Sequence, residues 1–509
     1  MRWPIVGVLL LSGVLPTARA VAQKGERTVG NGFVDVRFTP GANLAYQLDC
    51  VSGVVPFCGR ADYEALWRTH FLRTAVDSLR LRQWEALNRR YAVSIAPTGT
   101  GDDAREPMEV GQKLRLAQLQ SSTPADLLVR LELLLAPADW LIAREVVLHF
   151  TPPFDRWWRE TAAPTGEPFV QALRALLHRS DVAERVEQFV RFYGTTYPLA
   201  AGVPMQLLLR PGLVSEGTSG QQIERHAMLE FFADESPASR IDVAVHELCH
   251  FLFSTRSSER ATALGTRMRQ SPIPGAVAAF NLLNEGLATA LGNGVLARAV
   301  LDSARWQRRL DTPLSFYNNP HIDRAARVLL PLVDSALARG ETLDTPSFVD
   351  RYVAGVDSAF GASATSPALL LNELYLFVDA SLGDSVRRVV RRAIRPSSMY
   401  ADQTSVATAT FGDFTRQPAL SALLVVTPGA MRTLVRRGIV PSAGLRTLIG
   451  APRGADAVVQ VARRPSGSYL FVITARDGVA ATAMVDRLAA MSTIPTLLWR
   501  GSPLERATR

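Results

Sequence analysis

Cysteine is scarce in this chain of 509 residues, and long uncharged hydrophobic runs are absent beyond its N-terminal segment. Three cysteines are too few for a small domain held together by disulfides, and 35 glycines without a fixed repeat exclude a collagen-like chain. The lack of long apolar runs excludes a polytopic membrane protein. A hydrophobic content of 47% excludes wholesale disorder. The sequence therefore predicts a globular protein, of roughly two to four domains for its length.

Lysine is almost missing: only Lys24 and Lys113 occur among 56 basic residues, so arginine carries the net charge of +9. A basic chain binds nucleic acid when its cations gather along one groove with aromatic residues between them. The arginines here are scattered, and we therefore expect no nucleic-acid partner. Only the segment Asp384–Arg395 gathers arginines on one helical face, which is typical of a solvated surface helix and also compatible with anionic lipid or an acidic partner.

Residues 1–22 have the layout of a secretory signal peptide. Arg2 gives a positive start, a short apolar run extends to Pro16, and Ala20 and Ala22 each end a small-x-small pattern that suits signal cleavage. The alternative is an uncleaved membrane anchor, although the run is shorter than the ~20 residues of a membrane span. The sequence thus predicts a protein that is exported to the periplasm or the extracellular space, without a transmembrane segment once the signal is removed.

Export to an oxidising compartment bears on the cysteines. Cys50 and Cys58 flank a turn-rich segment and are predicted to form a disulfide, with two buried free thiols as the alternative.

The spacing of apolar residues predicts an α+β protein that is mainly helical. Helical periodicity dominates from residue 61 to residue 192, except in the Pro- and Trp-rich stretch 151–166, which breaks the pattern. Two strands are expected at Val203–Leu209 and Ile223–Phe232, before helices that begin near Ser239.

Two further strand-like runs, Leu420–Val426 and Tyr469–Thr474, are each followed by a helical stretch. They indicate a small C-terminal α/β module, which carries no glycine-rich phosphate fingerprint. We therefore divide the chain into four parts: the signal peptide at 1–22, an N-terminal mainly helical region at 23–192, a central domain at 193–400 and the C-terminal module at 401–509.

The segment His246-Glu247-Leu248-Cys249-His250 carries the chemistry. Histidines four residues apart on a helix project from one face, so both imidazoles can reach one Zn²⁺ ion. Glu247 follows the first histidine and can take the proton from a water that the metal has made acidic. The flanking residues are uncharged, as in a buried helix, and burying these three side chains without a metal would be costly. Cys249 points away from this face and is expected to be a small buried side chain rather than a ligand.

This motif resembles that of the His-Glu-x-x-His zinc metallopeptidases. The metzincin branch needs glycine at position 253 and histidine at position 256, where this chain has Phe253 and Arg256. The gluzincin branch takes a glutamate from a later helix, often within the string Asn-Glu-Gly-x-Ala, and Asn284-Glu285-Gly286-Leu287-Ala288 matches it. The resemblance implies a zincin-like domain, with a small sheet and metal-binding helices, at 193–400.

In that family the two histidines and the glutamate bind one zinc ion, which assigns His246, His250 and Glu285 as the metal ligands and Glu247 as the general base. His321 is an alternative third ligand. Gly286 and Ala288 are expected to be small so that the helix of Glu285 packs closely against the metal helix.

The resemblance also implies a strand that pairs with an extended peptide substrate. Ile223–Phe232 is the candidate, unless it is an internal strand of the sheet. Candidates for the residue that stabilises the oxyanion are Tyr317, His321 and Tyr375. Thr289 stands where the family has an aspartate, four residues after Glu285. The sequence therefore does not indicate which residue hydrogen-bonds to the imidazoles of the ligands.

The sequence therefore predicts an exported, zinc-dependent metallopeptidase that acts on peptides or proteins. Two alternatives remain: a zinc-binding scaffold whose cleft is covered, and a zinc hydrolase of non-peptide amides. Residues 23–190 are either a pro-segment or a fixed domain.

Overall fold

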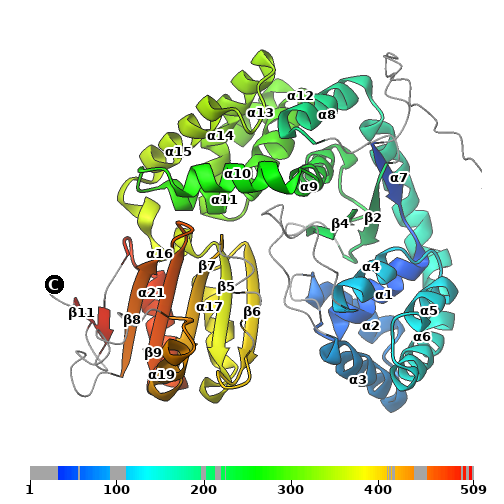
Figure 1. Ribbon diagram of the computed structural model, residues 1–509. Coiled ribbons are helices and arrows are strands. Elements are labelled where there is room, and N and C mark those ends of the chain that lie inside the picture. The colour runs from blue at the N-terminus through cyan, green and yellow to red at the C-terminus, as the bar shows by residue number, and fades with distance from the viewer. Residues whose placement is uncertain are drawn as a thin grey trace, which may run out of the picture.

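The computed structural model describes residues 33–54, 58–91, 110–195, 202–212, 219–223, 225–409, 411, 414, 419–440, 456–494, 497–499 and 504–506. They form an α+β structure in which helices predominate, as predicted (Figure 1). The candidate signal peptide, residues 1–22, lies outside the described residues. In the part of the chain that the structure describes, no helix has both the length and the apolar character of a membrane span.

The N-terminal part of the chain is a short strand followed by helices. The elements are β1 (Val34–Arg37), α1 (Pro40–Val51), α2 (Arg60–His70), α3 (Ala75–Arg90), α4 (Val110–Leu119), α5 (Pro124–Glu132), α6 (Pro137–Trp157), the π-helical turn η2 (Trp158–Ala162), α7 (Ala163–Leu177) and α8 (Ser180–Tyr193). Local sequence sets several helix ends. Thr74 and Asp77 form a capping box at the start of α3, and Gly194 ends α8 in the left-handed conformation.

The predicted break at 151–166 is wrong, because α6 continues through Pro152 and Pro153 and runs by way of η2 into α7. Each proline removes a helical hydrogen bond and costs about 3 kcal/mol in a helix interior. Phe154, Trp157 and Trp158 are buried along the same stretch. Burial of several such side chains, at roughly 1.5–3 kcal/mol each, offsets that penalty. The burial of these side chains therefore outweighs the local helix-breaking effect of the two prolines.

A four-stranded sheet follows in the chain. Its other strands are β2 (Val203–Leu209), β3 (Gly220–Ile223) and β4 (His226–Phe231), and the order is β1-β2-β4-β3. β1, β2 and β4 are parallel, whereas β3 runs antiparallel to β4 and lies at the edge. The predicted strand Val203–Leu209 is therefore confirmed. The candidate substrate strand Ile223–Phe232 is mostly β4, an internal strand, and the edge position belongs to β3 instead.

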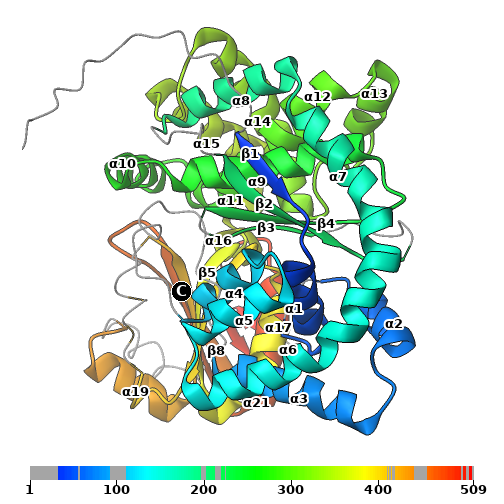
Figure 2. The same cartoon turned by 90° about the vertical axis from the view of Figure 1, so that its right-hand side faces the viewer.

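Helices complete this part of the molecule. They are η4 (Pro237–Ser239, 3₁₀), α9 (Ile241–Ser254), α10 (Ser258–Arg269), α11 (Ala276–Ala288), η5 (Thr289–Leu296, π-helical), α12 (Ala297–Val300), α13 (Ser303–Asp311), α14 (Pro320–Arg339), α15 (Pro346–Phe360), η6 (Gly361–Thr365, 3₁₀) and α16 (Pro367–Leu370). Figure 2 shows helices α12 to α14 above the small sheet and helices α1 to α6 below it, with α9 at the level of its strands.

One hydrophobic core runs from Phe33 to Leu369 and includes side chains of the N-terminal helices, the small sheet and the helices that follow it. The N-terminal strand β1 is itself a member of that sheet. The predicted boundary at residue 192 therefore does not separate two cores.

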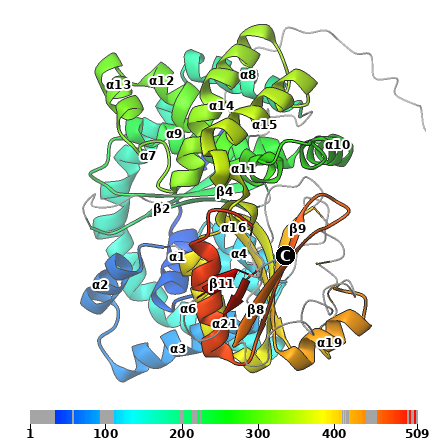
Figure 3. The same cartoon turned by 90° about the vertical axis from the view of Figure 1, so that its left-hand side faces the viewer.

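A second, seven-stranded sheet closes the chain. It contains β5 (Glu373–Asp379), β6 (Ser398–Thr404), β7 (Ser421–Val426), β8 (Ala457–Arg463), β9 (Tyr469–Ala475), β10 (Leu497–Trp499) and β11 (Leu504–Arg506), in the order β11-β10-β8-β9-β7-β5-β6. The helices around it are η7 (Ala380–Leu382, 3₁₀), α17 (Ser385–Ala393), α19 (Pro428–Arg436) and α21 (Gly478–Ala489). Helices α17 and α21 pack on one face of the sheet, and α19 packs on the other. Figure 3 shows α21 and α19 on opposite sides of the sheet.

The two strands predicted for the C-terminal module correspond to β7 and β9. The sheet also takes in β5 and the first three residues of β6, which precede the predicted boundary at residue 401. In the basic segment, Val386 and Val390 of α17 are buried, and Arg392 pairs with Asp486 of α21 at 2.9 Å. This packing is that of a surface helix with a solvated basic face.

Candidate metal centre

Helix α9 supplies the two histidines of the site. Their imidazole rings lie one turn apart on the same face, with ring centroids separated by 4.7 Å and the two Nε2 atoms by 3.0 Å. The apolar flanks of the motif explain why this helix is central, because Val245, Leu248 and Leu252 are fully buried in the core. The i, i+4 spacing therefore brings both Nε2 atoms to one point, as predicted.

Glu285 of α11 faces the same point. Its Oε2 atom lies 3.6 Å from Nε2 of His246 and 3.6 Å from Nε2 of His250. One donor atom from each of these three residues falls within 4.8 Å of the others. His246, His250 and Glu285 can therefore hold one metal ion.

Hydrogen bonds set the protonation of both imidazoles. Nδ1 of His250 lies 3.1 Å from Oδ1 of Asn284, and Nδ1 of His246 lies 3.0 Å from Oδ1 of Asn293. An amide oxygen accepts only, so in the neutral form of each ring Nδ1 carries the proton and Nε2 offers its lone pair to the shared point. The orientation of Asn293 is fixed in turn, because its Nδ2 donates to Oδ2 of Asp242 at 3.3 Å.

The carboxylate of Glu285 is also suited to bind a metal ion. Its Oε2 atom is buried and accepts no hydrogen bond from any residue that the structure describes. A buried carboxylate oxygen without a donor is costly unless a cation compensates it. Two imidazole lone pairs and one unpartnered carboxylate oxygen thus converge, and this donor set suits a divalent cation.

The ionisation of these groups is strongly coupled. Burial opposes charge on His250, but the Glu285 carboxylate outweighs it and raises the pKa of His250 to about 9. Burial likewise opposes charge on Glu285, yet the two imidazoles hold its pKa well below the usual range. Glu247 differs: burial, together with the nearby Glu285 charge, raises its pKa.

Asn293 reaches His246 because α11 continues into the π-helix η5. A π-turn widens the helix locally and is frequent at functional sites. Gly292, in the same turn, permits contact with α9, since a Cβ there would lie 2.7 Å from the carbonyl oxygen of Asp242. The predicted role of Gly286 is wrong: a Cβ on that residue would meet Leu329 of α14, not the metal helix. Asn293, and not Thr289, is the hydrogen-bond partner of the His246 imidazole. Asp242, which accepts from Asn293, pairs in turn with Arg309 at 2.6 Å.

Replacing Asn293 with alanine is expected to weaken metal binding by about 10- to 100-fold, because the proton on Nδ1 of His246 loses its acceptor and the ring its fixed orientation. Competition with a chromophoric chelator measures this affinity. Asn372→Ala is the matched control: Asn372 is also a buried amide, but it donates to the carbonyl oxygen of Asn281 at 3.1 Å and not to a candidate ligand. Equal affinities for the Asn293→Ala variant and the unaltered protein would refute the role given to Asn293.

Glu247 lies between the ligand group and the edge of the sheet. Its side chain is buried, and a Cβ on Gly220, the first residue of β3, would stand 2.3 Å from its Oε1 atom. Glycine at position 220 therefore lets the edge strand approach the carboxylate closely. Neither Gly220 nor Asn293 carried a signal in the sequence, whereas Asn284 stands inside the recognised string.

The three candidate oxyanion stabilisers have different places in the fold. Tyr317 lies at the site, where its ring stacks on His246 at 5.8 Å and its hydroxyl interacts with the Glu285 carboxylate. Asp323 of α14 holds this segment by accepting from the backbone N–H of Phe316 at 3.0 Å.

The other two candidates are not brought to the ligands. His321, at the start of α14, packs against Phe360 and does not join the ligand group. Tyr375 lies on β5 in the other sheet and packs against Phe414.

The cysteines lie apart from the ligand group. Cys249 is fully buried on α9, and burial raises the pKa of its thiol, as expected for a packed side chain that does not bind metal. The predicted disulfide between Cys50 and Cys58 is not formed in the structure. A hydrogen bond joins their side chains, so oxidation of the pair stays a prediction.

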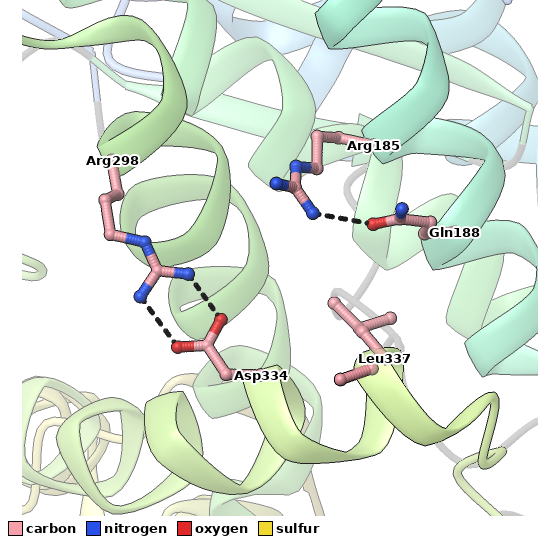
Figure 4. A pocket seen from close by; sticks show the side chains of 6 residues that line it. Arg185, Gln188, Arg298, Asp334 and Leu337 are labelled. Carbon is pink, nitrogen blue, oxygen red and sulfur yellow. Dashed lines mark hydrogen bonds and ion pairs between the residues drawn. The ribbon is translucent and has the colours of Figure 1, made fainter.

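A cavity of about 340 Å³ lies elsewhere, between α8, α12 and α14 (Figure 4). Arg298 and Asp334 pair on one side of it through two hydrogen bonds of 2.8 and 2.6 Å, and on the other side Arg185 donates to Gln188 at 2.9 Å. None of the metal-ligand candidates lines this cavity.

Comparison of the chain with protein-family models, with curated proteins and with solved structures found no match.

Proposed function

We propose that this protein is an exported, zinc-dependent metallopeptidase of the gluzincin type, with a zincin-like domain around the small sheet. One observation carries the proposal: Glu247 lies between a His-His-Glu ligand group and the first residue of an antiparallel edge strand. A metal site alone needs neither a buried carboxylate beside the ligands nor a strand edge next to it.

Zinc is the ion that the donors favour. Two imidazole nitrogens and one carboxylate oxygen are a common ligand set of catalytic zinc, which keeps a fourth position open. When bound there, zinc lowers the pKa of a water molecule and polarises a substrate carbonyl.

The chain's own residues supply the remaining chemistry. Glu247 accepts the proton of the attacking water and passes it to the leaving amine, and its buried position keeps competing water from solvating the carboxylate. Tyr317, held beside His246, donates a hydrogen bond to the oxygen that gains negative charge. Among the strands that the structure describes, β3 pairs with β4 alone, and its other side offers backbone N–H and C=O groups to an extended peptide.

The strand edge favours a peptide substrate over a small amide, because backbone pairing recognises an extended chain of any sequence. Export remains part of the proposal and rests on residues 1–22, which lie outside the described residues. The scaffold alternative predicts metal binding without turnover, and the amidase alternative predicts turnover without peptide cleavage.

The test is cleavage of a mixed peptide library by the chain from residue 23 onward, loaded with one equivalent of zinc. We expect internal peptide bonds to be cut, the activity to disappear on chelation, and added zinc to restore it. Mass spectrometry identifies the cleaved bonds. A zinc-loaded protein that cuts no peptide would refute the proposal. Release of small amines from non-peptide amides would then separate the amidase from the scaffold.

A further inference from the structure

Glu230 is a fully buried carboxylate on β4, outside the metal site. Its Oε1 atom accepts hydrogen bonds from the hydroxyls of Tyr46 at 3.0 Å and Tyr63 at 3.1 Å. Its Oε2 atom accepts from Ser219, through the backbone N–H at 3.2 Å and the hydroxyl at 2.7 Å. A buried carboxylate is tolerated only when such donors compensate it. Each oxygen is satisfied by a different part of the chain.

The donors to Oε1 come from the N-terminal helices. Tyr46 is on α1 and Tyr63 is on α2, and their rings meet edge to face at 5.8 Å. Burial, and then the charge of Glu230, raise the pKa of Tyr63 well above its usual value, and burial raises that of Tyr46. Both hydroxyls therefore keep their protons and remain donors.

The donors to Oε2 come from the residue that precedes the edge strand. Ser219 is held three times, because its carbonyl oxygen also accepts from the backbone N–H of Glu230 at 2.9 Å. The next residue is Gly220, whose backbone lies against the carboxylate of Glu247. A single buried side chain thus connects helices α1 and α2 to the point where the edge strand meets the proposed general base.

We propose that Glu230 is a positioning residue for peptide binding: it anchors the start of β3 through Ser219 and makes helices α1 and α2 part of the substrate-binding apparatus. This rests on the proposed function of β3 as the strand that pairs with substrate. It also assigns the region 23–190 as a fixed domain rather than a pro-segment, because its removal would take away two of the four donors and the strand β1.

The test compares Ser219→Ala, Tyr46→Phe and Tyr63→Phe in the full chain, each of which removes a hydroxyl donor and keeps the core volume close to that of the unaltered protein. Ser219→Ala is expected to raise KM for a cleaved peptide about tenfold, with kcat and zinc content unchanged, since it removes a hydrogen bond to a charged acceptor. The tyrosine variants should raise KM about threefold each. Hydrogen–deuterium exchange of the segment 219–223 should become faster in all three.

Tyr352→Phe is the control, because its hydroxyl is also fully buried and donates to the carbonyl oxygen of Ala279 at 3.0 Å, far along the chain from β3. It should leave KM and the exchange of 219–223 unchanged. Unchanged exchange in all three test variants would overturn the anchoring, and faster exchange with an unchanged KM would overturn its role in substrate binding. If the unaltered protein cleaves no peptide, the proposed function fails, and exchange alone still decides whether Glu230 anchors the strand.

Discussion

Replacing Glu247 with glutamine is expected to leave the metal in place and to reduce turnover by about 10²- to 10⁴-fold, the range that general acid–base catalysis supplies. Glutamine keeps the size of the side chain and fits the space beside Gly220, but it accepts no proton from water at neutral pH. The ligand atoms belong to His246, His250 and Glu285, so the substitution removes no donor from the metal. Steady-state kinetics on a cleaved peptide, with zinc measured by atomic emission, checks both parts of the expectation.

A matched control separates this effect from the loss of any buried carboxylate. The side chain of Glu235 is only 8% exposed and pairs with Arg240 at 2.5 Å, ahead of α9. Glu235→Gln is expected to lower stability without a comparable loss of kcat. Full activity of Glu247→Gln with zinc bound would disprove the mechanism even though the metal site remained intact.

The ligand group could be predicted because its determinants are local or belong to a recognised string. His246 and His250 meet because the helical repeat places residues four apart on one face. Glu285 followed from the string that surrounds it, although 35 residues separate it from His250. For the same reason the strand Val203–Leu209 was found: a compact apolar run before a turn needs no long-range information.

The support of the ligands could not be predicted, because it depends on a change of helical register. In a regular α-helix, the residue expected to support a ligand histidine is the one at position 289, four residues after Glu285. The π-helix η5 brings Asn293 to His246 instead, and no local pattern of residues announces such a turn.

The pairing of the strands also could not be predicted from the sequence. Whether Ile223–Phe232 is internal or at an edge depends on β1 and β2, which lie far away in the chain. The apolar residues of Ile223–Phe232 are compatible with either position, so the sequence of this run does not distinguish the two arrangements. The placing of β5 with β7, and of Tyr375 with Phe414, depends equally on partners distant in sequence.

The loss of Glu285 is expected to have the largest effect on metal binding. Glu285→Ala removes one of three protein ligands and leaves two neutral imidazoles, so we expect zinc affinity to fall by more than about 100-fold, beyond the cost of altering a residue that only supports a ligand. Activity should fall with it at limiting zinc. Competition titration of the purified chain against a chelator measures the change directly.

His321→Ala is the natural control, since His321 was the rival third ligand and packs against Phe360 instead. Its zinc affinity should equal that of the unaltered protein. Because His246 and His250 remain in both variants, the difference between the two isolates the third ligand. If His321→Ala lost zinc while Glu285→Ala kept it, the ligand assignment would be reversed, and Glu247 would no longer stand beside the group that its proposed role requires.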